Sequence, residues 1–395
     1  MKDRFSSSYT ISSLSVSASG PNRGVEKDSD LEAVRRGTEI SQPPRSAGVD
    51  LQQRLDRIYA AQYIAYKRSQ LRRSAILFLL TFLSTFLVGS NYMPLEYVLM
   101  KLSPGYEKYL VETVGAENLK LVLADAFAKG YHYAVPLMLI LFCHEMGHYL
   151  QSVRYRVPAS LPYFIPLPLP PMGTMGAVIF QGRGAATRKQ MFDIAVSGPL
   201  AGLLITIPVL WYGIQSSGYG PRPPGAGLEF GEPLLVKWMM SALHGDAPEG
   251  QIFLLNNIGF AGWVGVLITA MNLLPVGQLD GGHILYTLIG KPAHYVAYGV
   301  IGLAFAYMSL QQDFSFTLLL FLLLMTGPKH PPTANDAESI GVLRHLIGWA
   351  TLGFLVIGFT PTPIITPEPG VQHPEQKELP TPEFANRSDF ATGKA

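Results

Sequence analysis

The sequence predicts an all-α polytopic membrane protein with six to seven transmembrane helices and a re-entrant segment rich in proline and glycine. Only 15% of the 395 residues are charged and 48% are hydrophobic, whereas soluble domains average about 25% charged residues. The runs Ser74–Ser90 and Ile252–Leu279 contain no charge, and about 20 apolar residues are long enough to cross a bilayer as a helix. The net charge of +2 is uninformative about nucleic acid, but the sequence has no basic patch with interleaved aromatic residues, so we expect no nucleic-acid partner. The lipid bilayer is therefore the expected environment.

The N-terminal end is expected to lie in the cytoplasm. Residues 1–50 are rich in Ser, Gly, Arg and Asp, a composition typical of a disordered cytosolic tail. Residues 51–73 are expected to form a basic juxtamembrane helix, which the positive-inside rule keeps on the cytoplasmic side. The Ser-rich start resembles an organellar transit segment, but it contains acidic residues, which such segments avoid. We therefore expect a multi-pass protein of a bacterial inner membrane rather than of an organellar membrane.

The membrane domain is expected over residues 74–360, followed by a proline-rich disordered tail over residues 361–395. Residues 91–130 are predicted to be a mixed, amphipathic segment outside the membrane, and residues 214–250 an outer loop because of their many Gly and Pro residues. The sixth predicted span has only fourteen residues and can instead be re-entrant. The predicted spans are 74–90, 131–151, 193–212, 252–279, 294–310, 314–327 and 345–360.

The motif His144-Glu145-Met146-Gly147-His148 is the centre of the functional prediction. Histidines four residues apart lie on one helix face, so both imidazoles can reach one ion, and Glu145 lies close enough to contact a water bound to that ion. The eleven residues before His144 carry no charge, and ionisable side chains inside a membrane helix need a function or a partner. The alternative is a pair of hydrogen-bonded core histidines. The adjacent Cys143 points about 100° away and is interpreted as a buried, inert thiol.

Asp280 is the candidate third ligand. It follows a helix end broken by Pro275 and precedes Gly281 and Gly282, which remove bulk around the carboxylate. Two alternatives stay open: Asp280 can cap the helix that begins near Gly281, and His283 can compete for the ligand position. Two imidazole nitrogens and one carboxylate oxygen leave the fourth position of zinc for water. The sequence therefore predicts one catalytic Zn²⁺, although cobalt or iron can occupy such a site.

Peptide-bond hydrolysis is the reaction that needs all of these parts. Glu145 would accept a proton from the attacking water and deliver it to the leaving nitrogen. Asn272 can donate a hydrogen bond to the substrate carbonyl or the developing oxyanion. Alternatively, Asn272 satisfies helix carbonyls that Pro275 leaves free. We therefore expect a metal-dependent protease that works at membrane depth.

Two further segments are expected to support the site. Residues 157–189 contain too many prolines for a helix and are too apolar for a solvated loop. In this stretch Gly173, Thr174 and Gly176 leave backbone groups free to pair with an extended substrate. The alternative is a proline-rich connector at the membrane interface. Gly198 and Gly202 form a G-x-x-x-G pair that permits close approach of a neighbouring helix.

These motifs resemble those of the site-2 protease family of intramembrane zinc metalloproteases, peptidase family M50. His144–His148 matches the first motif of that family, and Asn272–Pro275 with Leu279–Gly281 matches the second. The resemblance covers about residues 130–290 and implies that these form the catalytic core, in which His144, His148 and Asp280 hold zinc and Glu145 is the base. It implies a transmembrane protein as substrate, cleaved within or near its membrane segment in regulated intramembrane proteolysis. The chain resembles the branch without a PDZ insert, which includes cyanobacterial and plastid members.

Two other functions stay open at this point. A catalytically inactive relative would bind membrane proteins without cutting them. A metal transporter would use the same residues as a transit site. Transport requires ligands spread along a path, whereas these candidate ligands cluster at two points near one membrane face.

Overall fold

The structure is a computed structural model that describes residues 45–101, 115–182, 184–221, 229–311, 317, 320, 323–324 and 327–365. The chain divides into two compact units, Met1–Ala65 and Tyr66–Ala395. Of the first unit, the structure describes only the beginning of a long helix, and all features below lie in the second. The predicted tails 1–50 and 361–395 and the predicted span 314–327 lie largely outside the described residues.

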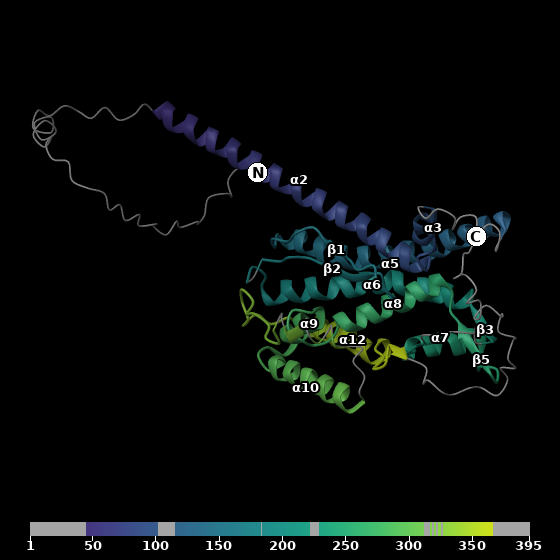
Figure 1. Ribbon diagram of the computed structural model, residues 1–395. Coiled ribbons are helices and arrows are strands. Elements are labelled where there is room, and N and C mark those ends of the chain that lie inside the picture. The colour runs from purple at the N-terminus through teal and green to yellow at the C-terminus, as the bar shows by residue number, and fades with distance from the viewer. Residues whose placement is uncertain are drawn as a thin grey trace, which may run out of the picture. The chain divides into compact units, whose positions relative to one another are not determined.

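Four helices among the described residues are long and apolar enough to cross a membrane. Two further helices, α8 (Asn257–Asn272) and α12 (Val342–Gly358), are apolar but shorter. These helices confirm the predicted helical, polytopic membrane architecture (Figure 1). The four long helices are α2 (Arg45–Gly89, with Lys67–Gly89 as its candidate span), α5 (Ala116–Tyr155), α6 (Arg188–Gln215) and α10 (Ala293–Gln311).

The first two helices are longer than predicted. The juxtamembrane helix and the first span are one continuous helix, α2, because no Gly or Pro interrupts residues 51–88. Helix α5 begins at Ala116 instead of Tyr131, although Gly130 lies inside it. A Cβ at Gly130 would lie 2.6 Å from the ring of Phe86 on α2. The glycine thus allows α2 and α5 to pack closely, and this packing stabilises the added turns. A short helix, α3 (Met93–Lys101), lies between them in sequence.

The predicted outer loop 214–250 is only partly irregular. It contains α7 (Leu234–His244) and the short strands β3 (Gly218–Pro221) and β4 (Glu229–Phe230). The helix was not predicted because the whole segment is rich in Gly and Pro. Helix α7 buries Val236 and Met240, which lie one turn apart, against the core. β3 pairs with β5 (Gln251–Leu254), and β4 pairs with β6 (Ile364–Ile365), both antiparallel.

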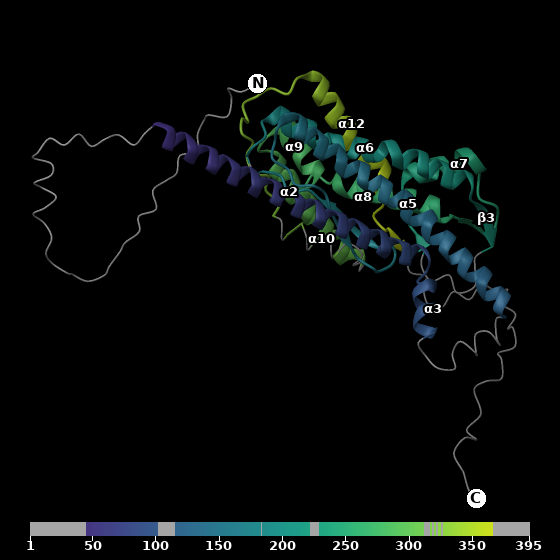
Figure 2. The same cartoon turned by 90° about the horizontal axis from the view of Figure 1, so that it is seen from above.

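The core is formed where α5, α6 and α8 pack side by side (Figures 1 and 2). Small residues let the backbones approach closely, as membrane helices commonly do. A Cβ at Gly213 of α6 would lie 2.2 Å from the Cα of Gly259 on α8, and one at Gly262 would lie 2.6 Å from the Cα of Leu210. The close contact between α6 and α8 therefore requires glycine at these positions.

The proline-rich segment forms an antiparallel hairpin of β1 (Tyr163–Pro166) and β2 (Thr174–Val178). An isolated bridge between Ala159 and Gln181 extends the hairpin away from its turn. The segment expected to be re-entrant is thus built around a β-hairpin, and its re-entry into the membrane stays a prediction. Its position against α2 and α5 comes from hydrogen bonds to those helices.

Hydroxyl groups of the neighbouring helices donate hydrogen bonds to carbonyl oxygens of the hairpin. On α2, Ser74 Oγ donates to Pro162 O and Ser84 Oγ donates to Gly173 O, both at 2.6 Å. On α5, Tyr133 OH donates to Met172 O at 2.7 Å. Non-helical backbone at membrane depth requires such partners, because lipid offers none.

We predict that Gly173→Ala lowers the melting temperature of the detergent-purified protein more than Gly176→Ala does. Both glycines have positive φ, +77° and +87°, so each alanine costs about 1–2 kcal/mol in backbone strain. At Gly173 the added Cβ would also lie 2.8 Å from Thr85 Cα, whereas nothing lies within 4 Å at Gly176. Overpacking of this kind adds about 1–3 kcal/mol. Equal losses in the two variants would show that the hairpin does not pack on α2 as described.

Candidate metal centre

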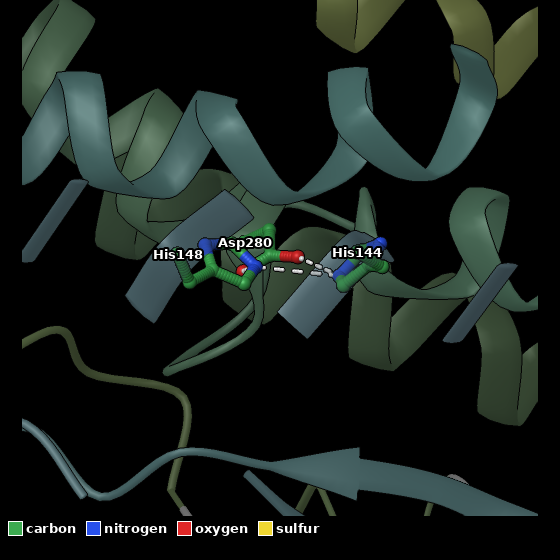
Figure 3. A group of neighbouring side chains, drawn as sticks. All are labelled: His144, His148 and Asp280. Atoms are coloured by element: carbon green, nitrogen blue, oxygen red, sulfur yellow. Dashed lines mark hydrogen bonds and ion pairs between the residues drawn. The ribbon is translucent and has the colours of Figure 1, made fainter. Parts of the chain in front are cut away.

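Three side chains from two helices far apart in sequence meet at one point. His144 and His148 lie one turn apart on α5, and Asp280 is the first residue of α9 (Asp280–Ile289). His144 Nε2 lies 3.2 Å from one carboxylate oxygen of Asp280, and His148 Nε2 lies 3.3 Å from the other. The two Nε2 atoms are 3.3 Å apart. Figure 3 shows the carboxylate between the two imidazoles.

This geometry fits a zinc ion. Ligand atoms about 2.0–2.2 Å from a tetrahedral ion lie about 3.3–3.6 Å from one another, close to the separations of 3.2–3.3 Å between the three donor groups. These donors are the only cluster of three His, Cys, Asp or Glu side chains in the described part of the chain that could hold a metal ion. Two nitrogens and one oxygen form the ligand set of catalytic zinc, with one position open.

The Asp280 carboxylate does not cap α9. The N-cap of that helix is Leu279, and no side-chain capping bond is made, so the capping interpretation is wrong. Gly281 and Gly282 allow α9 to begin directly against the end of α8: Cβ atoms there would lie 1.9 Å from Leu273 O and 2.6 Å from Gly277 O. The glycines thus place the carboxylate opposite α5.

The other end of α9 is held by a residue of α6. Arg188 Nε donates to Thr287 O at 2.7 Å, and its Nη2 donates to Leu288 O at 3.2 Å. A guanidinium at a helix C-terminus satisfies carbonyls that have no partner within the helix. Both ends of the helix that carries Asp280 are therefore fixed.

A backbone carbonyl of α6 orients His148. His148 Nδ1 lies 2.8 Å from Ile194 O. Because a carbonyl oxygen can only accept, Nδ1 carries the proton and Nε2 keeps its lone pair for the metal centre. The residue before Ile194, Asp193, accepts two hydrogen bonds from Arg344 on α12, at 2.8 and 2.9 Å, and one from Tyr155 OH. This network joins α5, α6 and α12 directly beside the carbonyl.

Glycines on α6 make room for both imidazoles. A Cβ at Gly198 would lie 2.0 Å from His148 Nε2, and one at Gly202 would lie 3.1 Å from His144 Nδ1. A Cβ at Gly147 of α5 would lie 2.4 Å from the backbone oxygen of Ser197 on α6. The predicted G-x-x-x-G pair therefore does more than pack two helices, because it leaves the space that the histidine rings occupy.

A cavity of about 190 Å³ opens beside the three ligands. Glu145 is only 6% exposed, and within the described residues its carboxylate makes no hydrogen bond, so it is free to act on a molecule in the cavity. Asn272 lines the same cavity, and its side chain also makes no hydrogen bond to a described residue. The helix carbonyls freed by Pro275 are thus not its partners. Residues Ala177, Val178, Ile179 and Gln181 form another wall.

The three hairpin residues predicted for substrate support lie further from the site than expected, whereas Asn272 lines the cavity. Gly173, Thr174 and Gly176 do not line the cavity. Thr174 Oγ1 instead donates to Ile165 O and accepts from Gly176 N, both at 3.0 Å, and so holds the hairpin turn together. The part of the hairpin that reaches the cavity is 177–179, at and just beyond the end of β2. The predicted segment is therefore beside the site, but a different end of its second strand faces the cavity.

Sequence reasoning missed the residues that hold the ligands in place. Asp193, Tyr155 and Arg344 were not singled out, although a lone carboxylate near one span end and a lone arginine near another were a signal for an ion pair. His283 was considered as a ligand, but its Nδ1 is hydrogen-bonded to His330. Cys143 is half-buried rather than buried as predicted.

Comparison with known proteins agrees with this geometry. The family model described as peptidase family M50 matches residues 132–308. The chain is 31% identical over 223 residues to a probable zinc metalloprotease EGY1, chloroplastic, of Oryza sativa subsp. japonica, a match that covers 53% of this chain and 37% of the relative. It is 28% identical over 302 residues to the Arabidopsis thaliana EGY1 protein, covering 72% and 52%, and 29% identical over 247 residues to the Arabidopsis EGY2 protein, covering 61% and 42%. The chain thus spans about half or less of the length of these relatives.

We predict that Gly198→Ala abolishes zinc binding, whereas Gly202→Ala retains it. The Cβ at position 198 would occupy the place of His148 Nε2, while the one at position 202 would require a shift of a few tenths of an ångström. Zinc per protein, measured by mass spectrometry of metals after purification, should fall from about one to near zero in the first variant only. A full zinc content in Gly198→Ala would contradict the described approach of α6 to the histidine.

Proposed function

We propose that the chain is an intramembrane zinc metalloprotease of the site-2 protease family, because the model of peptidase family M50 matches residues 132–308 and its relatives are named probable zinc metalloproteases. It hydrolyses peptide bonds within or near the transmembrane segments of membrane-anchored proteins. The observation that carries this proposal is the meeting of His144, His148 and Asp280 beside the free carboxylate of Glu145. Ionisable side chains gathered at one point inside a helical membrane protein are energetically costly and typically mark a functional site.

The residues divide the chemistry among them. His144, His148 and Asp280 would hold the zinc ion, which when bound supplies a Lewis acid that polarises the scissile carbonyl and makes water acidic. Glu145 takes a proton from the attacking water and passes it to the leaving nitrogen. Asn272, which lines the same cavity, donates a hydrogen bond to the carbonyl oxygen as it gains negative charge.

The substrate is bound as an extended chain. An α-helix with its side chains is about 10–12 Å wide, too wide for a cavity of about 190 Å³. In the described residues β2 pairs only with β1, so the cavity-lining segment 177–179 can add a substrate strand through backbone hydrogen bonds. A substrate helix therefore has to unwind before cleavage, which favours segments that contain helix-weakening residues.

The orientation in the membrane follows from charge. Arg72 and Arg73 lie near the N-terminal end of the first candidate span, and Arg154 and Arg156 follow the metal-binding turn of α5. By the positive-inside rule, these residues and the N-terminus face the cytoplasm, and the metal centre opens near that face. A bacterial inner membrane is one candidate location, and a plastid membrane is the other, because the relatives are named chloroplastic. The same orientation applies in either membrane.

We predict that Glu145→Gln abolishes cleavage of a labelled transmembrane peptide by the purified protein while zinc stays bound. The substitution removes the base and keeps the shape, so a rate loss of at least about 10²-fold is expected. Asp280→Ala is the matched control for the metal, because it should lose both zinc and activity. Cleavage and metal content are measured on the same preparations.

Other outcomes of this experiment separate the rival functions. A wild-type protein that binds the peptide and never cleaves it would identify an inactive relative. Zinc uptake into liposomes without cleavage would identify a transporter. Undiminished cleavage by Glu145→Gln with zinc bound would remove Glu145 from its proposed role.

A further inference from the structure

A second histidine pair lies behind the metal centre. His283 is on α9, about one turn after Asp280, and lines the catalytic cavity. Its Nδ1 is hydrogen-bonded to Nε2 of His330, which is only 5% exposed. His283 is not part of the three-ligand cluster, so it has another role in the cavity.

The loop 327–341 holds His330 in this position. Asp336 accepts hydrogen bonds from Tyr286 OH at 2.9 Å and from Thr333 Oγ1 at 2.6 Å. The Tyr286 ring stacks on the His330 ring, with centroids 4.3 Å apart. Ala334 N donates to Ala186 O just before α6. The loop is thereby tied both to α9 and to the start of α6.

The hydrogen bonds fix which nitrogen of each ring carries a proton. His330 Nδ1 lies 2.5 Å from Pro331 O, and a carbonyl can only accept, so this nitrogen is the donor. Burial lowers the pKa of His330 to about 3, so the ring is neutral and its Nε2 can only accept. Because His283 Nδ1 is hydrogen-bonded to this acceptor, Nδ1 is the donor, and Nε2 of the neutral His283 ring keeps a lone pair.

An extended substrate needs an acceptor at this place. Successive N–H and C=O groups of a strand point to both of its sides. The hairpin segment 177–179 can pair with one side, while His283 and Asn272 line the cavity beyond it. Asn272 can donate to a substrate carbonyl, but a substrate N–H on that side needs an acceptor, because an unpaired buried N–H is costly.

We propose that His283 binds the substrate: its Nε2 accepts a backbone N–H of the extended peptide, and His330 is the positioning residue that keeps that nitrogen unprotonated. The inference rests on the proposed proteolytic function and adds a binding contact to it. It also assigns a role to the loop 327–341, because His330 of this loop sets the tautomer of the His283 ring.

The test measures peptide binding rather than activity. In a Glu145→Gln background, which leaves the substrate intact, affinity is measured for a series of transmembrane peptides around the cleavage site. In each peptide one backbone N–H is replaced by an ester oxygen, which removes the donor and also weakens the adjacent carbonyl as an acceptor, so each ester is compared between the parent protein and the variants. One ester position should weaken binding to the parent protein roughly three- to tenfold.

The variants isolate the Nε2 contact. His283→Asn keeps a donor next to His330 but has no atom at the Nε2 position. The ester that weakens binding to the parent should therefore not lower the peptide affinity of this variant further. His283→Gln places a side-chain oxygen near that position and should restore part of the effect. His330→Ala should behave like His283→Asn, because the His283 ring is no longer fixed. His345→Ala, on α12 and away from the cavity lining, is the matched control and should behave like the parent.

The outcomes distinguish this inference from the proposed function. If every ester lowers peptide affinity for His283→Asn as much as for the parent, the contact does not exist and the inference is overturned. Cleavage by the wild-type protein would still support the proposed protease. If the coupling is found but the wild-type protein never cleaves, the binding inference stands and the proposed function fails. Zinc content is measured in each variant, and loss of zinc in His283→Asn would overturn the inference in favour of a role in metal binding.

Discussion

The close approach of α6 to the metal-binding turn of α5 is the constraint on which the site depends. Gly147, Gly198 and Gly202 have no side chains at the contact, so the two backbones lie near enough for Ile194 O to reach His148. A larger residue at position 198 would coincide with the imidazole itself. The ligand geometry is therefore set by missing side chains as much as by the ligands.

A second constraint is that polar backbone groups inside a membrane protein need protein partners. The hairpin β1–β2 is able to lie beside the metal centre because Ser74, Ser84 and Tyr133 supply hydroxyl donors to its carbonyls. The free edge of the hairpin can then take a substrate strand. The same rule explains the pairing of His283 with His330, since neither buried ring is left with an unmatched N–H.

The sequence predicted the elements that have a local signal. The motif at His144–His148, the uncharged runs and the glycines after Asp280 are each visible in one short continuous stretch of sequence. The resemblance of the two motifs to those of a known family then indicated Asp280, whose carboxylate the structure places beside the two histidines. The contacts that fix the site join distant segments: Arg344 lies 151 residues from Asp193, and His330 lies 47 residues from His283. No periodicity or spacing marks such pairs. The placement of Thr174 at the hairpin turn depends on strand register, which a proline-rich stretch does not specify.

Helix α6 contributes no ligand, yet it contacts both imidazole rings and the helix that carries Asp280. Its first residue, Arg188, secures the helix of Asp280, its second turn orients His148, and its glycines accommodate both rings. The two helices that carry the ligands, α5 and α9, are thus both positioned by contacts with α6. Sequence variation along this helix would therefore change metal affinity, although no side chain of the helix is itself a ligand.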